Sequence, residues 1–139
     1  VLEDTIELQC AADDHVALRT KANTVSTADL VRSTLRLRPD RIIVGEVRGA
    51  EALDLLKAWG TGHPGGLATL HAGSALGALI RLEQLIQEVV VTVPRALIAE
   101  AVDVVVFIAG RGRKRRVEDI IRVTGLDGDA YAIEHVTGE

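Results

Sequence analysis

The chain has 139 residues, 47% of them hydrophobic, so it can build the core of one domain or of part of one. A formal net charge of −4 argues against a dedicated nucleic-acid-binding protein, and a single cysteine, Cys10, excludes an internal disulfide and fits a reducing compartment. No apolar run reaches the roughly 18 residues that a membrane-spanning helix needs, and we expect no signal peptide.

The first element is a short apolar segment that runs into acids. Residues 1–8 carry Glu3, Asp4 and Glu7, which predicts a strand that ends in an acidic loop. From these residues alone, a solvated turn and a functional acidic loop are both open. The segment His15–Arg19 alternates and predicts a second short strand. Because the chain starts at Val1 and contains no methionine, we expect a fragment or processed form of a longer protein.

A capping pattern predicts the first helix. Ser26 is followed three residues later by Asp29, and the helix that they begin is expected to run to about Leu37. Three arginines lie off its apolar stripe: Arg32, Arg36 and Arg38. They form either a solvated face or a contact with a phosphate of this subunit or a neighbouring one.

The β-branched run Ile42–Val44 predicts a strand buried on both faces, as in a parallel sheet. Glu46 follows it, at the edge where ligands bind in open α/β sheets. A surface acid and a functional carboxylate are both open on this ground alone. A helix from Gly49 to about Trp59 comes next, so strands and helices alternate.

Two histidines bracket the next predicted strand, Gly66–Leu70, which we expect to be buried. His63 precedes it in a glycine-rich turn, and His71 follows it at the same edge as Glu46 if the strands are parallel. Each histidine is either structural or in contact with phosphate or water. A metal site is not expected, because the two rings would lie at opposite ends of the strand with no cysteine nearby.

The remaining residues predict two helices and three strands. The helices are expected over Ala75 to about Val90 and from Pro94 to about Ala101. The apolar face of the first, expected in the core, consists of Leu76, Leu79, Ile80, Leu82, Leu85, Ile86 and Val89. The strands are expected at Asp103–Ala109, Val117–Thr124 and Tyr131–Val136, the last of them antiparallel. Between the first two strands, Arg111–Arg116 forms a basic hairpin tip, which is either solvated or in contact with an acidic lipid surface.

Three segments together resemble one family, the secretion or traffic ATPases of type II and type IV secretion and of type IV pili. Residues 1–8 resemble its Asp box, residues 41–49 its Walker B motif with glycine before the glutamate, and residues 62–74 its His box. The eight-residue step between the histidines and the segment Pro94–Phe107 resemble the TrbB-type conjugal transfer ATPases most.

The resemblance implies an α/β fold: part of a RecA-like P-loop NTPase domain, with a mostly parallel central sheet flanked by helices and an antiparallel C-terminal hairpin. Residues 1–139 would be the C-terminal portion of that domain, with residues 75–139 as its last helices and hairpin. The sequence contains no G-x-x-x-x-G-K-[ST] motif, so we expect the Walker A loop and the N-terminal domain to be missing.

The resemblance also implies ATP hydrolysis with Mg²⁺ in the intact protein and an inactive fragment here. The implied catalytic residues are Glu46, Glu3 and His71. The residues implied to lie near nucleotide or Mg²⁺ are Asp4, Glu7, Arg48 and His63, and no structural metal is expected.

The implied assembly is a homo-oligomer, a hexameric ring that contacts other secretion or conjugation subunits. The implied location is the bacterial cytoplasm, with peripheral association with the inner membrane as a further expectation. Sequence-specific nucleic-acid binding is not expected. Three alternatives remain: a pilus or type II secretion assembly ATPase, a non-catalytic oligomerisation or docking fragment, and a RecA-like nucleic-acid motor. The acidic balance and scarce aromatic residues count against the last.

Overall fold

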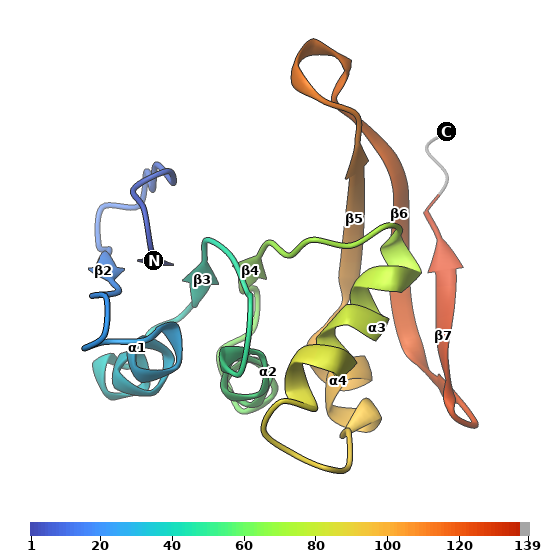
Figure 1. Cartoon of the computed structure of the whole chain (residues 1–139), viewed down its shortest axis with the longest axis horizontal. Coiled ribbons are helices and arrows are strands. Elements are labelled where there is room, and N and C mark those ends of the chain that lie inside the picture. Colours follow the sequence, from blue (N-terminus) through green and yellow to red (C-terminus); the bar gives the residue numbers. More distant parts are fainter. Residues whose placement is uncertain (137–139) are drawn as a thin grey trace. The chain divides into compact units, whose positions relative to one another are not determined.

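The structure is a computed structural model that describes residues 1–136, so the last three residues of the predicted segment 75–139 lie outside it. The chain forms two compact units, the first spanning Val1–Leu70 and the second beginning at His71. Each has its own sheet (Figure 1). No helix within residues 1–136 is long and apolar enough to cross a membrane.

The first unit is the predicted parallel sheet. Its strands are β1 (Leu2–Glu3), β2 (Leu18–Arg19), β3 (Ile43–Val44) and β4 (Leu67–Ala68). They run parallel in the order β2-β1-β3-β4, so the carboxyl ends of all four meet at one edge. The parallel α/β arrangement expected from the sequence is confirmed.

Two helices cover the sheet of the first unit. They are α1 (Thr27–Thr34), extended by the 3₁₀ turn η1 (Leu35–Leu37), and α2 (Glu51–Gly60). The crossovers from β2 to β3 and from β3 to β4 advance in one direction, so right-handed connections place both helices on one face, as Figure 1 shows. The Ser26–Asp29 capping box forms as predicted.

The strand β3 and the residue before it belong to the core of the first unit. Ile42 and Val44 are fully buried, and the Trp59 indole on α2 donates a hydrogen bond of 3.2 Å to the Ile42 carbonyl oxygen. The prediction that β4 is a buried strand is wrong in part, because Leu67 is 60% exposed. Within residues 1–136, β4 is an edge strand, and its side chain on the open face lacks a neighbouring element.

The second unit packs two helices on an antiparallel sheet. The helices are α3 (Ala75–Ile86) and α4 (Arg95–Ala101), and the strands, in the order β5-β6-β7, are β5 (Val104–Ala109), β6 (Arg116–Asp127) and β7 (Ala130–His135). The 3₁₀ turn η2 (Gly112–Lys114) joins β5 to β6. The predicted C-terminal hairpin is therefore the outer part of a three-stranded sheet.

The helix α3 is shorter than predicted and buries a different stripe. It ends at Ile86 rather than near Val90, and the chain then turns back through hydrogen bonds to the Ile86 carbonyl oxygen. Leu76 and Ile80, expected in the core, are 41% and 48% exposed. At 3.6 residues per turn they flank the buried stripe, which consists of Ala75, Ala78, Leu79, Leu82, Leu85 and Ile86.

Candidate functional site

Polar residues follow all four strands at the carboxyl edge of the first sheet. The register pairs Leu2 with Val44, and the Gly45 amide donates to the Leu2 carbonyl oxygen at 2.8 Å. Asp4 and Glu46 therefore leave the sheet from neighbouring strands, at the edge where ligands bind in this class of fold.

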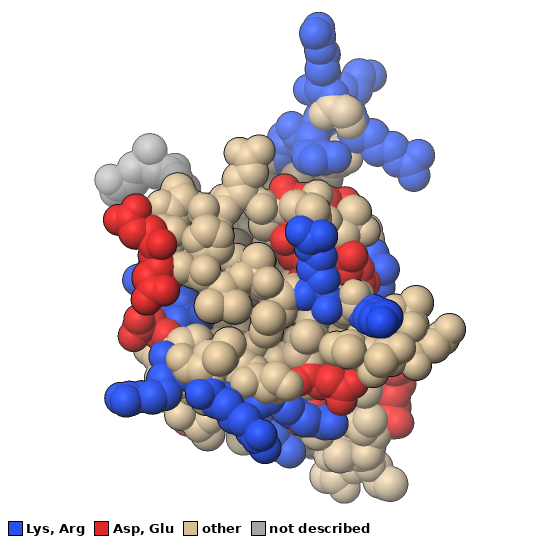
Figure 2. Space-filling model, turned by 90° about the vertical axis from the view of Figure 1, so that its left-hand side faces the viewer, with Lys and Arg blue, Asp and Glu red and all other residues tan. Residues whose placement is uncertain are grey.

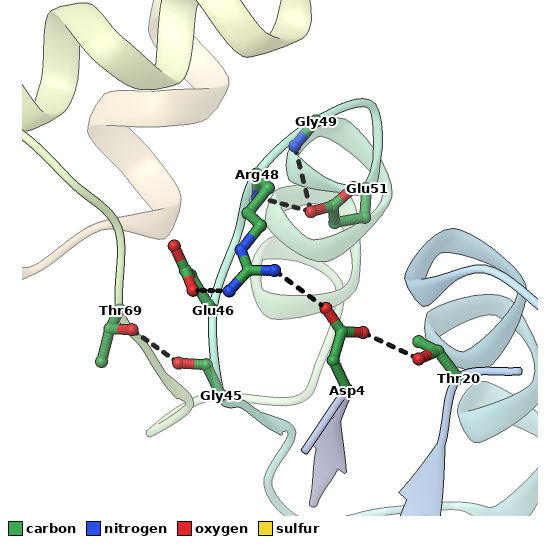
Figure 3. A network of polar contacts seen from close by, with 8 residues as sticks. All are labelled: Asp4, Thr20, Gly45, Glu46, Arg48, Gly49, Glu51 and Thr69. Carbon is green, nitrogen blue, oxygen red and sulfur yellow. Dashed lines mark hydrogen bonds and ion pairs between the residues drawn. The ribbon is translucent and has the colours of Figure 1, made fainter. Parts of the chain in front are cut away.

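Arg48 bridges these two acids (Figure 3). Its Nη2 donates to Oε2 of Glu46, and its Nη1 lies 3.3 Å from Oδ2 of Asp4. The other Asp4 oxygen, Oδ1, accepts a 2.8 Å hydrogen bond from the hydroxyl of Thr20, beyond the end of β2. One guanidinium thus connects the loops after β1 and β3, and a threonine extends the network to β2.

The electrostatics of the network favour the charged arginine. The hydrogen bond and charge of Glu46, followed by the charge of Asp4, raise the pKa of Arg48 above its usual value. Its side chain is 64% exposed, whereas that of Glu46 is only 22% exposed. The carboxylate is therefore largely shielded from solvent, while the arginine side chain is exposed.

The backbone of the Glu46 loop is held from two sides. At the start of α2, Oε1 of Glu51 accepts hydrogen bonds from the amides of Arg48 and Gly49, at 2.6 and 3.1 Å. After β4, the Thr69 hydroxyl donates to the Gly45 carbonyl oxygen at 2.5 Å, and the Val47 amide donates to the Thr69 carbonyl oxygen at 2.8 Å. Figure 3 shows these side chains converging on residues 45–49.

Three of these positioning residues were not identified from the sequence: Thr20, Glu51 and Thr69. Each nevertheless has a position in the sequence that is typical of such a role. Thr20 and Thr69 come directly after a strand, and Glu51 is an acid in the first turn of a helix, where the helix dipole favours it. Their partners, however, depend on strand register, which the local sequence does not give.

Glu3 is engaged in holding its own loop. Its Oε1 accepts hydrogen bonds from the amides of Glu7 and Leu8, at 3.0 and 2.7 Å. These two bonds hold the pKa of the Glu3 carboxyl below its usual value. Its Cγ also lies close to Gly45, where a Cβ would come within 3.3 Å. The predicted catalytic role of Glu3 and the Mg²⁺-associated role of Glu7 stay predictions.

The structure places His63 at the opposite edge of the sheet from Glu46. Its Nδ1 is 2.6 Å from the Pro39 carbonyl oxygen, before β3. It lines a groove of about 770 Å³ together with Arg38 and Arg41. A role for His63 toward nucleotide stays a prediction, and the first unit does not bring it to the Asp4–Arg48–Glu46 network.

His71 is the first residue of the second unit, two positions after Thr69, and it is exposed. Its predicted role also stays a prediction. Within residues 1–136, no group of three or more histidine, cysteine, aspartate or glutamate residues is arranged to hold a metal ion. A protein-only metal cage therefore does not occur in the described part of the chain.

The geometry defines an α/β protein with a carboxylate–arginine network at the ligand edge of a parallel sheet. Residues 1–111 match the family described as Type II/IV secretion system protein. The chain belongs to this family.

Relatives and a solved structure agree with this assignment. The chain is 53% identical to the conjugal transfer protein TrbB of Rhizobium radiobacter, over 97% of this chain and 42% of the relative. It is 41% identical to the type IV secretion system protein PtlH of Bordetella pertussis, over 90% of this chain and 42% of the relative. It thus spans less than half the length of these relatives.

The structure is similar to the crystal structure of the VirB11 ATPase from the Brucella suis type IV secretion system in complex with sulphate. The TM-score is 0.77 at 31% sequence identity, covering 87% of this chain and 38% of that chain. The predicted fold class and the predicted family are therefore confirmed.

Proposed function

We propose that this chain is part of an ATP-hydrolysing motor subunit of a conjugative or type IV secretion system, which powers assembly of the transfer apparatus or translocation of its substrate. The similarity to TrbB and to the VirB11 ATPase supports this proposal. The observation that carries it is the bridge that Arg48 makes between Asp4 and Glu46 at the ligand edge of the sheet. Residues 1–139 would be the C-terminal portion of the RecA-like domain.

Glu46 is the group that orients or deprotonates the attacking water in this proposal. Its carboxylate is half-buried at a strand end, and the hydrogen bond from Arg48 fixes its orientation. Phosphoryl transfer depends mainly on such positioning and on charge neutralisation. His71 would sense the γ-phosphate and pass the change to α3, whose first residue, Ala75, follows it closely.

The residues fit Mg²⁺ as a partly protein-bound ion. Mg²⁺ commonly takes one or two carboxylates and completes its shell with water and phosphate oxygens. Asp4 offers such a carboxylate at the exposed rim, and Glu3 and Glu7 lie in the same loop. When bound, Mg²⁺ would neutralise phosphate charge. The sequence contains no lysine-bearing phosphate loop, so we expect this chain alone not to hydrolyse ATP.

The proposal extends to assembly and location. We expect the intact protein to form a hexameric ring with other secretion subunits, in the bacterial cytoplasm and peripherally on the inner membrane. A pilus or type II secretion assembly ATPase remains a second candidate, because the matched family covers both type II and type IV systems. Identity of 53% to a conjugal transfer protein favours the first.

The test is Glu46→Gln in the full-length protein. We expect ATP binding to be retained and turnover to fall by about 10²–10³-fold, the usual cost of losing one essential charged group. Glu100→Gln, an exposed acid on α4, is the matched control and should retain turnover. Normal turnover in Glu46→Gln would remove this residue from the mechanism.

A further inference from the structure

The turn between β5 and β6 concentrates positive charge on an otherwise acidic chain. Five of the six residues in Arg111–Arg116 are lysine or arginine, whereas the whole chain carries a formal net charge of −4. All six residues are exposed. The basic side chains at the top of Figure 2 project together as one cluster, at the end of the long β5–β6 ribbon of Figure 1.

Backbone hydrogen bonds give the turn Arg111–Arg116 a defined shape. The Lys114 amide donates to the Arg111 carbonyl oxygen at 3.1 Å, and the Arg115 amide to that of Gly112 at 3.2 Å. Gly110 has a φ of +86°, and a Cβ there would lie 2.2 Å from the Lys114 carbonyl oxygen. Only glycine fits, so the backbone holds the cations in a defined group.

Most of this charge is not neutralised within the described part of the chain. Across residues 1–136, Arg116 has a carboxylate partner, Glu118 at 2.7 Å, whereas the other four cations form no ion pair. A set of cations held together without acids repels itself, so an external anion would stabilise it.

Exposed aliphatic side chains lie directly below the cations. Ile108 of β5 and Val117 of β6 pair across the strands and are 54% and 55% exposed. Farther along the same face of β5, Val106 is 49% exposed. The end of the ribbon is therefore amphipathic, with a cationic apex over an aliphatic base.

We propose that Arg111–Arg116 binds the surface of an anionic lipid bilayer, with Ile108 and Val117 at the level of the headgroups. This proposal rests on the proposed peripheral membrane association and names the surface that provides it. Clustered lysines and arginines are attracted to anionic headgroups, and short aliphatic side chains gain from leaving water at the interface.

The shape of the tip favours lipid over nucleic acid. A convex point can collect mobile anionic lipids around itself, whereas the phosphates of a duplex are fixed along a line and few could reach one turn. The turn also contains no aromatic residue on which a base could stack.

The test measures sedimentation of the 139-residue chain with vesicles of phosphatidylcholine alone or mixed with phosphatidylglycerol. We expect binding to the mixed vesicles only, and its loss at high salt, because the screening length falls from about 10 Å at 0.1 M to about 3 Å at 1 M. The double variant Arg113→Glu and Lys114→Glu should weaken binding by on the order of tenfold or more.

Two controls make the outcome decisive. Arg36→Glu with Lys57→Glu changes the net charge equally at exposed sites of the first unit and should retain binding. Circular dichroism of both double variants reports whether they fold. Arg113→Gln with Lys114→Gln, a milder pair, should also weaken binding.

Four results would overturn the proposal. They are an equal loss of binding in both charge-reversal variants, equal binding to neutral vesicles, no binding at low salt, and displacement of the chain from vesicles by duplex DNA. None of these results would affect the Glu46 test.

Discussion

Arg48 Nη1 lies 3.3 Å from Asp4 Oδ2, although the two residues are 44 positions apart in the sequence. The contact exists because β1 and β3 are parallel neighbours, so the loops that follow them leave the sheet side by side. Arg48 simultaneously holds Glu46, which makes the orientation of one carboxylate depend on the other.

Arg48→Ala in the full-length protein should therefore reduce hydrolysis more than nucleotide binding. Without the guanidinium, Glu46 loses the hydrogen bond from Arg48 that helps to orient it, and a misplacement of about 1 Å can cost about 10²-fold in rate. Arg48→Lys should recover only part of this loss, because an ammonium group cannot reproduce the planar fork that reaches two carboxylates. Single-turnover rates and nucleotide affinity, measured separately, check this. Unchanged rates in Arg48→Ala would show that the bridge does not position Glu46.

Thr69 provides a test of how the Glu46 loop is held. Thr69→Val keeps the side-chain shape but removes the 2.5 Å hydrogen bond to the Gly45 carbonyl oxygen, so we expect a loss of about 1 kcal/mol in the free energy of unfolding. Thr69→Ser, which retains the hydroxyl, should lose less. Urea denaturation of the chain measures both variants. A Thr69→Val variant as stable as the wild type would show that this hydrogen bond does not stabilise the loop.

The local sequence predicted the elements on which the site is built. The β-branched run Ile42–Val44 indicated a buried strand. Because Glu46 follows this strand, the sequence also placed a carboxylate at the ligand edge of the sheet. The capping pattern at Ser26 located α1 because an N-cap acts over only three residues. Such signals are short-range, so a sequence carries them directly.

The contacts between elements could not be predicted in the same way. Thr69 meets Gly45 only because β4 pairs with β3 in one particular register, and the residues themselves do not specify it. Strand order also accounts for the exposure of Leu67. Its strand was predicted to be buried, but it lies at the edge of its sheet. Glu3 was expected to be catalytic, which stays a prediction, and the sequence did not indicate that its oxygen accepts two amides of its own loop.

The second unit should be sensitive to acid through Glu83. Its carboxylate accepts hydrogen bonds from Arg95 at 2.9 and 3.1 Å and from the Tyr131 hydroxyl at 2.8 Å, joining α3, α4 and β7. The bond from Arg95, and then that from Tyr131, lower the pKa of Glu83 below its ordinary value of 4.5.

Because the pKa of Glu83 is lowered in the folded state, Glu83 stabilises the second unit at neutral pH and less so in acid. The unfolded state takes up the proton more readily, so the stabilisation is fully present above about pH 4.5 and is lost as pH falls through the folded pKa. Glu83→Gln should cost about 1–3 kcal/mol at neutral pH and flatten the acid limb of the stability curve. Urea denaturation across the acid range checks both effects. A variant whose acid limb is as steep as that of the wild type would exclude Glu83 as the titrating group.

Gly110 tests whether the basic tip needs its fixed turn. At Gly110→Ala the new methyl group would meet the Lys114 carbonyl oxygen at 2.2 Å, so the turn must open.

The matched control is Gly128→Ala in the β6–β7 turn, where φ is +60° but nothing lies within 4 Å. The control should lose only the cost of the left-handed conformation, about 1–2 kcal/mol, and Gly110→Ala should lose more. Because only the first variant rearranges the cations, it alone should weaken sedimentation with anionic vesicles. If both variants bind vesicles as the wild type does, the charge of the tip matters and its shape does not.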